Sequence, residues 1–197
     1  MLKEPPFSNE QSLQLINEMI GKAKRSYTTK GIASMVWGTL IIFCSMVTWV
    51  QVKFNFNIGF DIWLLIIVAL ISQIYFSIKE KKDKKFVSHD EQTLSYVWST
   101  FSICIFITSF YNSKYGGENS TTLVMMLYGI PTFITGGIFK FKPMIIGGII
   151  CWIISIISMY TSFQNDILLM AACGLFAWLI PGIILWNRYK KGELVNV

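Results

Sequence analysis

The residues that could carry chemistry are few and scattered along the chain. The only histidine, His89, stands next to Asp90 and Glu91 in a charged stretch, where a histidine is normally solvated. Asp61 and Asp166 stand at the ends of apolar runs, where we expect water to reach them. No Asp, Glu, Lys, Arg or His falls in the middle of an apolar run. The sequence therefore offers neither a proton relay nor the ligands of an intramembrane metal site.

The four cysteines do not form a redox or zinc motif. Each stands inside an apolar run, and no two have the C-x-x-C spacing of disulfide or zinc frameworks. We interpret them as small, polarisable packing residues. Serines are plentiful, but no base inside an apolar run stands ready to activate one. The sequence thus predicts a protein that is not an enzyme and binds no cofactor. The cysteines are Cys44, Cys104, Cys151 and Cys173.

Composition indicates a multi-span membrane protein. The 197 residues are 53% hydrophobic and only 14% charged, whereas soluble domains carry about 25% charged residues. The net charge of +6 lies in stretches between the apolar runs. That pattern is typical of topology signals and of contact with anionic lipid, so we expect a lipid bilayer as partner and no nucleic acid.

Six apolar runs predict an all-α integral membrane bundle of six transmembrane helices, arranged as three hairpins. Residues 31–187 would form this membrane domain, after an N-terminal segment at 1–30 and before a cytoplasmic basic tail at 188–197. The runs lie at about 31–50, 62–78, 94–111, 123–139, 144–160 and 167–186.

The first 30 residues predict a cytoplasmic amphipathic helix. Ser8 begins a capping-box pattern, and Leu13, Ile16 and Ile20 follow at helical spacing before a basic end. Two interpretations remain open. The helix either lies on anionic lipid of the inner leaflet, or it is held under the bundle or against a partner.

Lysine and arginine define the predicted orientation. Of the 17 basic residues, all but Lys53 and Lys114 fall in the two termini or in alternate loops on one side. Since basic loop residues set the orientation of membrane proteins, both termini are predicted to be cytoplasmic. The charged run at 79–85 is expected to hold anionic lipid, at about 1 kcal/mol per basic residue near the surface. Its candidate lipid contacts are Lys81, Lys82, Lys84 and Lys85.

Prolines, glycines and hydroxyls in the last three runs form the candidate site. Proline inside a span frees a backbone carbonyl, and glycine lets helices approach closely. Such residues either line a seam that binds a neutral or amphipathic ligand, or they serve in packing and hydrogen bonding, which is the favoured interpretation. The glycine pairs on both sides of the 140–143 turn predict close packing of the fourth and fifth runs. The candidates are Pro131, Thr132, Thr135, Gly136, Gly137, Gly147, Gly148, Ser155 and Pro181, and Tyr128 and Gln73 are further polar candidates.

Two stretches suggest an internal repeat. SMVWGT at 34–39 opens the first run, and SYVWST at 95–100 opens the third. Three hairpins in the same orientation would resemble transporters built from parallel repeats. The alternative is chance similarity between apolar segments.

Three stretches carry a resemblance to a known group of proteins. LQLINEMIGKAKRSY at 13–27, the WG at 37–38 and LYGIPTFITGGIFKFKPMIIGGIICWIISI at 127–156 resemble a family of small bacterial inner-membrane proteins without assigned function. The resemblance implies six spans and a bacterial inner membrane. It carries over no catalytic or binding residue.

The sequence thus favours a multi-pass inner-membrane protein of regulatory, scaffolding or partner-binding type. Its partner would be another protein or a second copy. The alternative is a small oligomeric transporter or channel subunit for a neutral or amphipathic solute, which needs a water-accessible path at mid-membrane depth.

Reporter fusions test the predicted topology. Fusions after Lys85 and Lys142 should report the cytoplasm, and fusions at Asn57 and Gly117 should report the outside, because basic loops are retained on the cytoplasmic side. An external signal from the Lys85 fusion would overturn the six-span arrangement.

Overall fold

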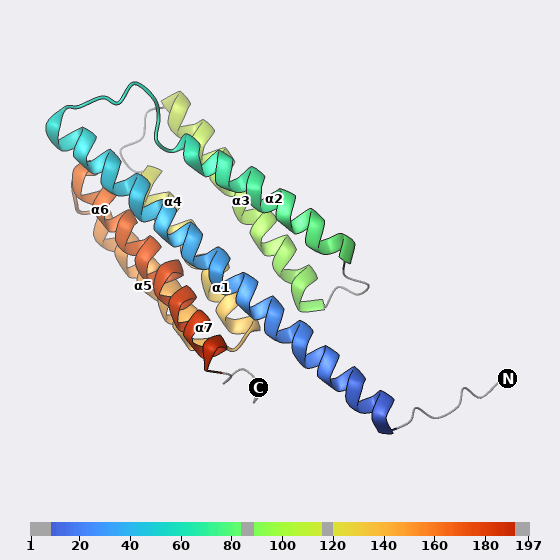
Figure 1. The fold of residues 1–197 in the computed structure, drawn as a ribbon. Helices are drawn as coiled ribbons and strands as arrows, with labels where there is room; N and C mark the ends of the chain where they lie inside the picture. The colour runs from blue at the N-terminus through green and yellow to red at the C-terminus, as the bar shows by residue number, and fades with distance from the viewer. Residues whose placement is uncertain (1–8, 84–88, 116–119, 192–197) are drawn as a thin grey trace.

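The structure, a computed structural model of the chain, describes residues 9–83, 89–115 and 120–191. These residues form helices and no strand, as the composition predicted (Figure 1). In chain order the helices are α1 (Asn9–Phe54), α2 (Leu64–Asp83), α3 (His89–Tyr115), α4 (Ser120–Ile138), α5 (Lys142–Ser158), α6 (Phe163–Gly174), a π-helical segment η1 (Leu175–Leu179) and α7 (Ile180–Lys190).

Several of these helices match the thickness of a bilayer. Among the described residues, four stretches are long and apolar enough to cross a membrane: Gly31–Phe54, His89–Lys114, Ser120–Ile138 and Phe163–Arg188. Lys142–Ser158 is a shorter apolar helix. The sixth predicted run is one continuous helix, because α6, η1 and α7 follow one another without a break.

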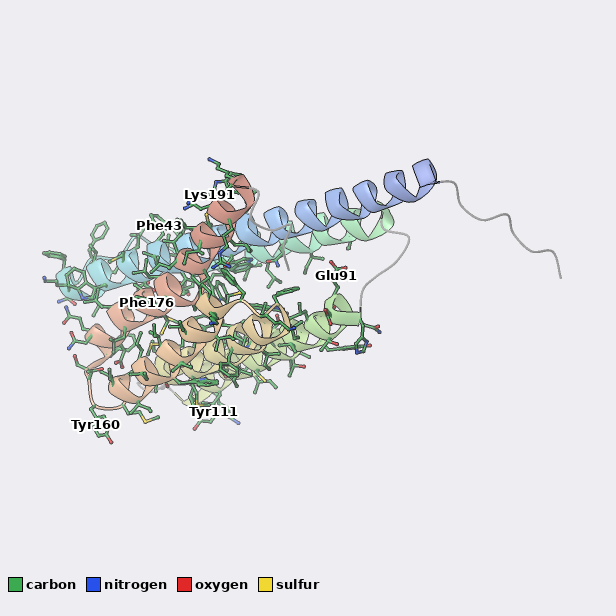
Figure 2. The ribbon with its side chains drawn as sticks, turned by 90° about the horizontal axis from the view of Figure 1, so that it is seen from below. Phe43, Glu91, Tyr111, Tyr160, Phe176 and Lys191 are labelled. Carbon is green, nitrogen blue, oxygen red and sulfur yellow. The ribbon has the colours of Figure 1, made fainter. Side chains whose placement is uncertain are left out.

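The helices divide into a closely packed body and two outer helices. In the body, α4 pairs with α5, α1 runs along α6 and α7, and α5 also contacts η1. The outer helix α3 packs on α4, whereas α2 makes only sparse contact with α1. In Figure 2, α2 (green) lies beside α1, and α3 (yellow-green) lies on the side of the molecule formed by α4 and α5. The closest pairs therefore join helices of different predicted hairpins.

Glycine explains the close pairing of α4 with α5. A Cβ atom added at Gly136 would lie 2.7 Å from the backbone nitrogen of Ile145, and one at Gly148 would lie 2.9 Å from the carbonyl oxygen of Gly129. Only the absence of side chains lets the two backbones approach this far. The predicted packing of these two helices beside their turn is confirmed.

A second glycine contact joins α1 to the last helix. A Cβ atom at Gly38 would lie 2.7 Å from the backbone nitrogen of Leu179, and one at Gly182 would lie 3.0 Å from the carbonyl oxygen of Gly31. Gly31 and Gly38 lie two helical turns apart, so both face the same partner. The sequence did not indicate this contact, although Gly38 belongs to the WG at 37–38.

The N-terminal helix differs from the prediction. It is not a separate element, because α1 continues without a break from Asn9 to Phe54 over 46 residues, or about 69 Å at 1.5 Å per residue. Figure 1 shows its first part extending beyond the rest of the bundle. A helix that continues a membrane span without a turn cannot also lie flat on that membrane. The interpretation as a surface-bound helix therefore does not fit α1.

The core lies where α1, α4, α5 and the last helix meet. Three cysteines are buried in this region, Cys44, Cys151 and Cys173, and all four cysteines are free thiols. The interpretation of the buried three as packing residues fits these positions. Other core members are Ile41, Met125, Tyr128, Ile154, Met170, Ala177 and Trp178.

A pair of alanine substitutions tests the glycine contacts. Gly148→Ala should destabilise the protein by about 1–3 kcal/mol, because the new methyl group overlaps the α4 backbone. Gly137→Ala is the matched control: nothing lies within 4 Å of a Cβ there, so helix propensity should stabilise it by about 0.5–1 kcal/mol. Thermal unfolding in detergent measures both. Equal melting temperatures for the two variants would contradict the packing described.

Candidate functional site

Trp178 is the centre of an aromatic cluster inside the body. Its side chain is buried, with 6% of its surface exposed. The ring centres of Trp37, Trp98 and Tyr128 lie 6.0, 5.7 and 5.3 Å from that of Trp178. Phe101 completes the cluster through edge contacts with Trp98 and a tilted contact with Tyr128. Rings from α1, α3, α4 and η1 thus meet at one point, at distances typical of favourable aromatic pairs.

The backbone around Trp178 is irregular for an identifiable reason. Pro181 has no N–H and cannot donate to the carbonyl of Ala177, so the regular ladder cannot pass this position unchanged. The residues just before Pro181 form a π-helical turn, in which the Ile180 N–H donates to the carbonyl of Leu175. Such turns are rare and often accompany functional sites. Pro181 itself is buried.

Hydrogen bonds connect Trp178 to the neighbouring helices. Its indole N–H donates to the Thr132 hydroxyl at 3.1 Å, and that hydroxyl donates to the carbonyl of Tyr128 at 2.8 Å. The Ser34 hydroxyl donates to the carbonyl of Trp178 at 2.8 Å. These bonds satisfy the polar atoms internally, so Thr132, a predicted site residue, holds the cluster together.

Among the described side chains, Gln73 of the outer helix α2 bonds to the cluster. The indole N–H of Trp37 donates to the side-chain oxygen of Gln73. Gln73 was one of the polar residues considered in the sequence. Because α2 has sparse contact with the body, this bond is a specific link between them.

The other predicted hydroxyls bond elsewhere. Thr135 is buried and donates to the carbonyl of Pro131 at 2.6 Å, within its own helix. Ser155 donates to the carbonyl of Thr122 at 3.2 Å, at the opposite end of α4. The predicted residues therefore do not form one continuous polar seam.

Buried hydroxyls around Ser155 join α4 to α5. The hydroxyls of Thr122 and Ser158 lie 2.6 Å apart, and both residues are buried. The Trp152 indole N–H donates to the carbonyl of Met126 at 3.2 Å, and this ring fills the space beside Gly129. Packing and hydrogen bonding account for this end of the interface.

Two predicted glycines have roles that the sequence did not indicate. Gly147 faces the last helix rather than α4, because a Cβ there would lie 2.5 Å from the carbonyl oxygen of Phe176. Gly137 is exposed, and a Cβ atom added there would have nothing within 4 Å. Each predicted glycine pair therefore contributes one residue to the close approach of α4 and α5, namely Gly136 and Gly148.

Asp166 differs from its expected position. Only 3% of its surface is exposed, and the Thr161 hydroxyl donates to its carboxylate. Thr161, in the turn just before α6, thus lies against this side chain. The expectation that water reaches Asp166 is wrong, whereas Asp61 is exposed as expected.

The predicted lipid-contact lysines are only partly placed. Lys81 and Lys82 lie in the last turn of α2, and their side chains lie outside the described part. Lys84 and Lys85 lie outside the described residues altogether.

The tryptophans of the cluster were the main functional candidates that sequence reasoning missed. A signal for two of them was present, because Trp37 and Trp98 occupy the same position in the repeated stretches SMVWGT and SYVWST. Both contact Trp178 in the structure. A search for fully buried side chains would not have found Trp37 and Trp98, because both are half-buried.

Neither the comparisons with known proteins nor a search for metal ligands identifies a function for this site. Comparison of the chain with protein-family models, with curated proteins and with solved structures found no match. Among the described residues, no group of three or more His, Cys, Asp or Glu is placed to hold a metal ion.

Thiol labelling tests whether water reaches the candidate residues. In a Cys104→Ser background, Thr132→Cys, Thr135→Cys and Ser155→Cys should not react with a membrane-impermeant maleimide, because all three positions are buried. Asn57→Cys in the exposed loop after α1 should react fully. Labelling of Thr132→Cys at the rate of Asn57→Cys would reveal a water path through the body.

Proposed function

We propose that the protein is a six-span inner-membrane protein of non-enzymatic, partner-binding type, with both termini in the cytoplasm. The distribution of lysine and arginine supports the orientation. The resemblance noted above supports the bacterial inner membrane. The body of α1, α4, α5 and the last helix forms a dry scaffold, and the outer helix α3 receives a membrane-spanning helix of another protein chain.

The exposure of α3 is the observation that supports this function best. Only 6% of its apolar stretch is buried inside the protein. Its contacts with the body come from one row of side chains that includes Trp98 and Phe101. A helix of this length that leaves most of its surface free has room for another helix.

A row of small residues lies next to that contact row. All five serines of α3 fall on it, at the alternating spacing of four and three residues that faces a partner helix in coiled coils. Each of them is exposed. Ser102 and Ser109 donate to carbonyls of their own helix at 2.9 Å, so their hydroxyls need no other partner. The row consists of Ser95, Ser99, Ser102, Ser109 and Ser113, with Phe106 between them.

The body shows how this chain uses small residues. At Gly38, Gly136 and Gly148 the missing side chain brings two helix backbones together. Small residues, including serine, commonly mark helix interfaces in membranes because they allow close approach. The serine row would likewise let a partner helix approach closely. Lipid chains gain nothing from small residues, because they pack equally well on large apolar side chains.

A transporter is the second candidate function. The π-helical turn at Trp178 and the buried prolines favour it, since broken helices often line transport sites. Against it stand the buried and internally bonded hydroxyls of Thr132, Thr135 and Ser155.

Photo-crosslinking tests the partner-binding function. A diazirine amino acid at Ser102 or Ser109 should yield a protein adduct in native membranes, and the same probe at Ile107 should yield lipid adducts alone. Ile107 is a matched control, because it is exposed at similar depth on another face of α3. The adduct mass distinguishes a second copy from a different protein. Lipid adducts alone at all three positions would contradict the function.

A further inference from the structure

An arginine covers an aromatic ring at the end of the body, and two lysines stand next to that ring in the sequence. Lys140 precedes Phe141 in the turn after α4, and Lys142 follows it as the first residue of α5. The guanidinium of Arg188, near the end of α7, lies over the Phe141 ring, 5.5 Å from its centre. Phe141 is buried, whereas the three cationic residues are exposed. Within the described part of the chain, no carboxylate pairs with any of the three.

Lys140 stands where helices normally end in glycine. The Phe141 N–H donates to the carbonyl of Gly136 at 2.8 Å, and the Lys140 N–H donates to that of Gly137 at 3.1 Å. These bonds form a Schellman motif, in which the residue after the helix adopts the left-handed conformation. Lys140 has a φ of +50°. A residue with a Cβ is strained in this conformation, whereas glycine is not.

The other left-handed positions show the usual choice of residue. Among the described residues, Asn55 and Gly59 also have positive φ, and both residue types tolerate it. Lysine at 140 is the exception. A lysine in the preceding turn would stabilise the helix dipole equally well without the strain. The strained turn therefore has a further consequence, which is to place a lysine next to Phe141, whose ring Arg188 covers, and two residues from Lys142.

We propose that Lys140, Lys142 and Arg188 bind the phosphate of an anionic phospholipid headgroup. The site lies where apolar helices end, which is the depth of phosphates in a bilayer. Trp186 lies near the same end of the body, and the Lys190 ammonium is 5.3 Å from the centre of its ring. Tryptophan is enriched at the membrane–water interface, where lipid headgroups lie. The planar guanidinium of arginine matches phosphate oxygens, and two lysines add charge. The site is distinct from the charged run at 79–85, and it rests on the proposed function only through the membrane placement.

Lipid retention and thermal stability together test the site. Wild-type protein in neutral detergent is titrated with phosphatidylglycerol or phosphatidylcholine, and bound lipid is counted by native mass spectrometry. The wild type should retain phosphatidylglycerol preferentially. Lys142→Gln and Arg188→Gln should each weaken its binding about fivefold, the equivalent of about 1 kcal/mol per basic residue. Lys53→Gln, at the far end of α1, is the control and should bind like wild type.

Lys140→Gly separates binding from folding. It should also weaken phosphatidylglycerol binding about fivefold, yet raise the melting temperature by about 2–4 °C, because glycine relieves the strained turn. A purely structural lysine would leave lipid binding unchanged in this variant, and that result would overturn the site. Displacement of the lipid by inorganic phosphate would overturn the lipid headgroup as its ligand.

The outcomes also separate this site from the proposed function. If the wild type retains lipid but the three variants retain it equally, the site alone fails. If the wild type retains neither lipid, the membrane placement fails and the site fails with it.

Discussion

The structure depends on the close approach of helix backbones at positions that lack a side chain. Gly136 and Gly148 allow it between α4 and α5, and Gly147 allows it between α5 and η1. Gly38 and Gly182 allow it between α1 and the last helix. In a membrane the hydrophobic effect gives little drive for helices to associate, so close van der Waals packing has to supply it. These contacts connect all four helices of the body.

Close packing at the glycines also determines where the large side chains gather. Trp178 lies in the π-helical turn that comes just before Pro181. The rings of Trp37 and Trp98 then contact it from two other helices. Thr132 satisfies the buried indole N–H. The side chains of Trp178, Tyr128 and Thr132 are thus buried at the centre of the body, which supports a scaffold better than a pathway for solutes.

Much of the fold could be predicted from the sequence, because it depends on local patterns. Apolar length predicted long apolar helices, and four stretches among the described residues are long and apolar enough to cross a membrane. The glycine pairs beside the 140–143 turn predicted the α4–α5 contact. The partner of Gly147 and the cluster at Trp178 could not be predicted, since they depend on which distant helices become neighbours. The start of α1 was misjudged because nothing between Lys24 and Gly31 stops a helix, and a capping pattern alone does not show where a helix ends. The burial of Asp166 could not be predicted either, because it depends on the tertiary packing around the start of α6.

The proposed function depends on the difference between the closely packed body and the outer helices α2 and α3. The body is held by backbone contacts, whereas α2 has sparse contact with α1 and, among the described side chains, is linked to it by the Trp37–Gln73 bond. An element held by few contacts can open at low free energy, and regions that bind partners are often of this kind. The serine row of α3 faces outward from the same scaffold.

Pulsed electron paramagnetic resonance tests this division most directly. Spin labels at Ile156 on α5 and Ile183 on α7, both exposed positions, report on the body in a Cys104→Ser background. A second pair, Ile156 and Ile71, reports on α2 relative to that body. A narrow distance distribution for the first pair and a clearly broader one for the second, in lipid nanodiscs without partner, is the expected result. Equally narrow distributions, or a broad one within the body, would contradict a body held together at its glycines with a loosely held α2.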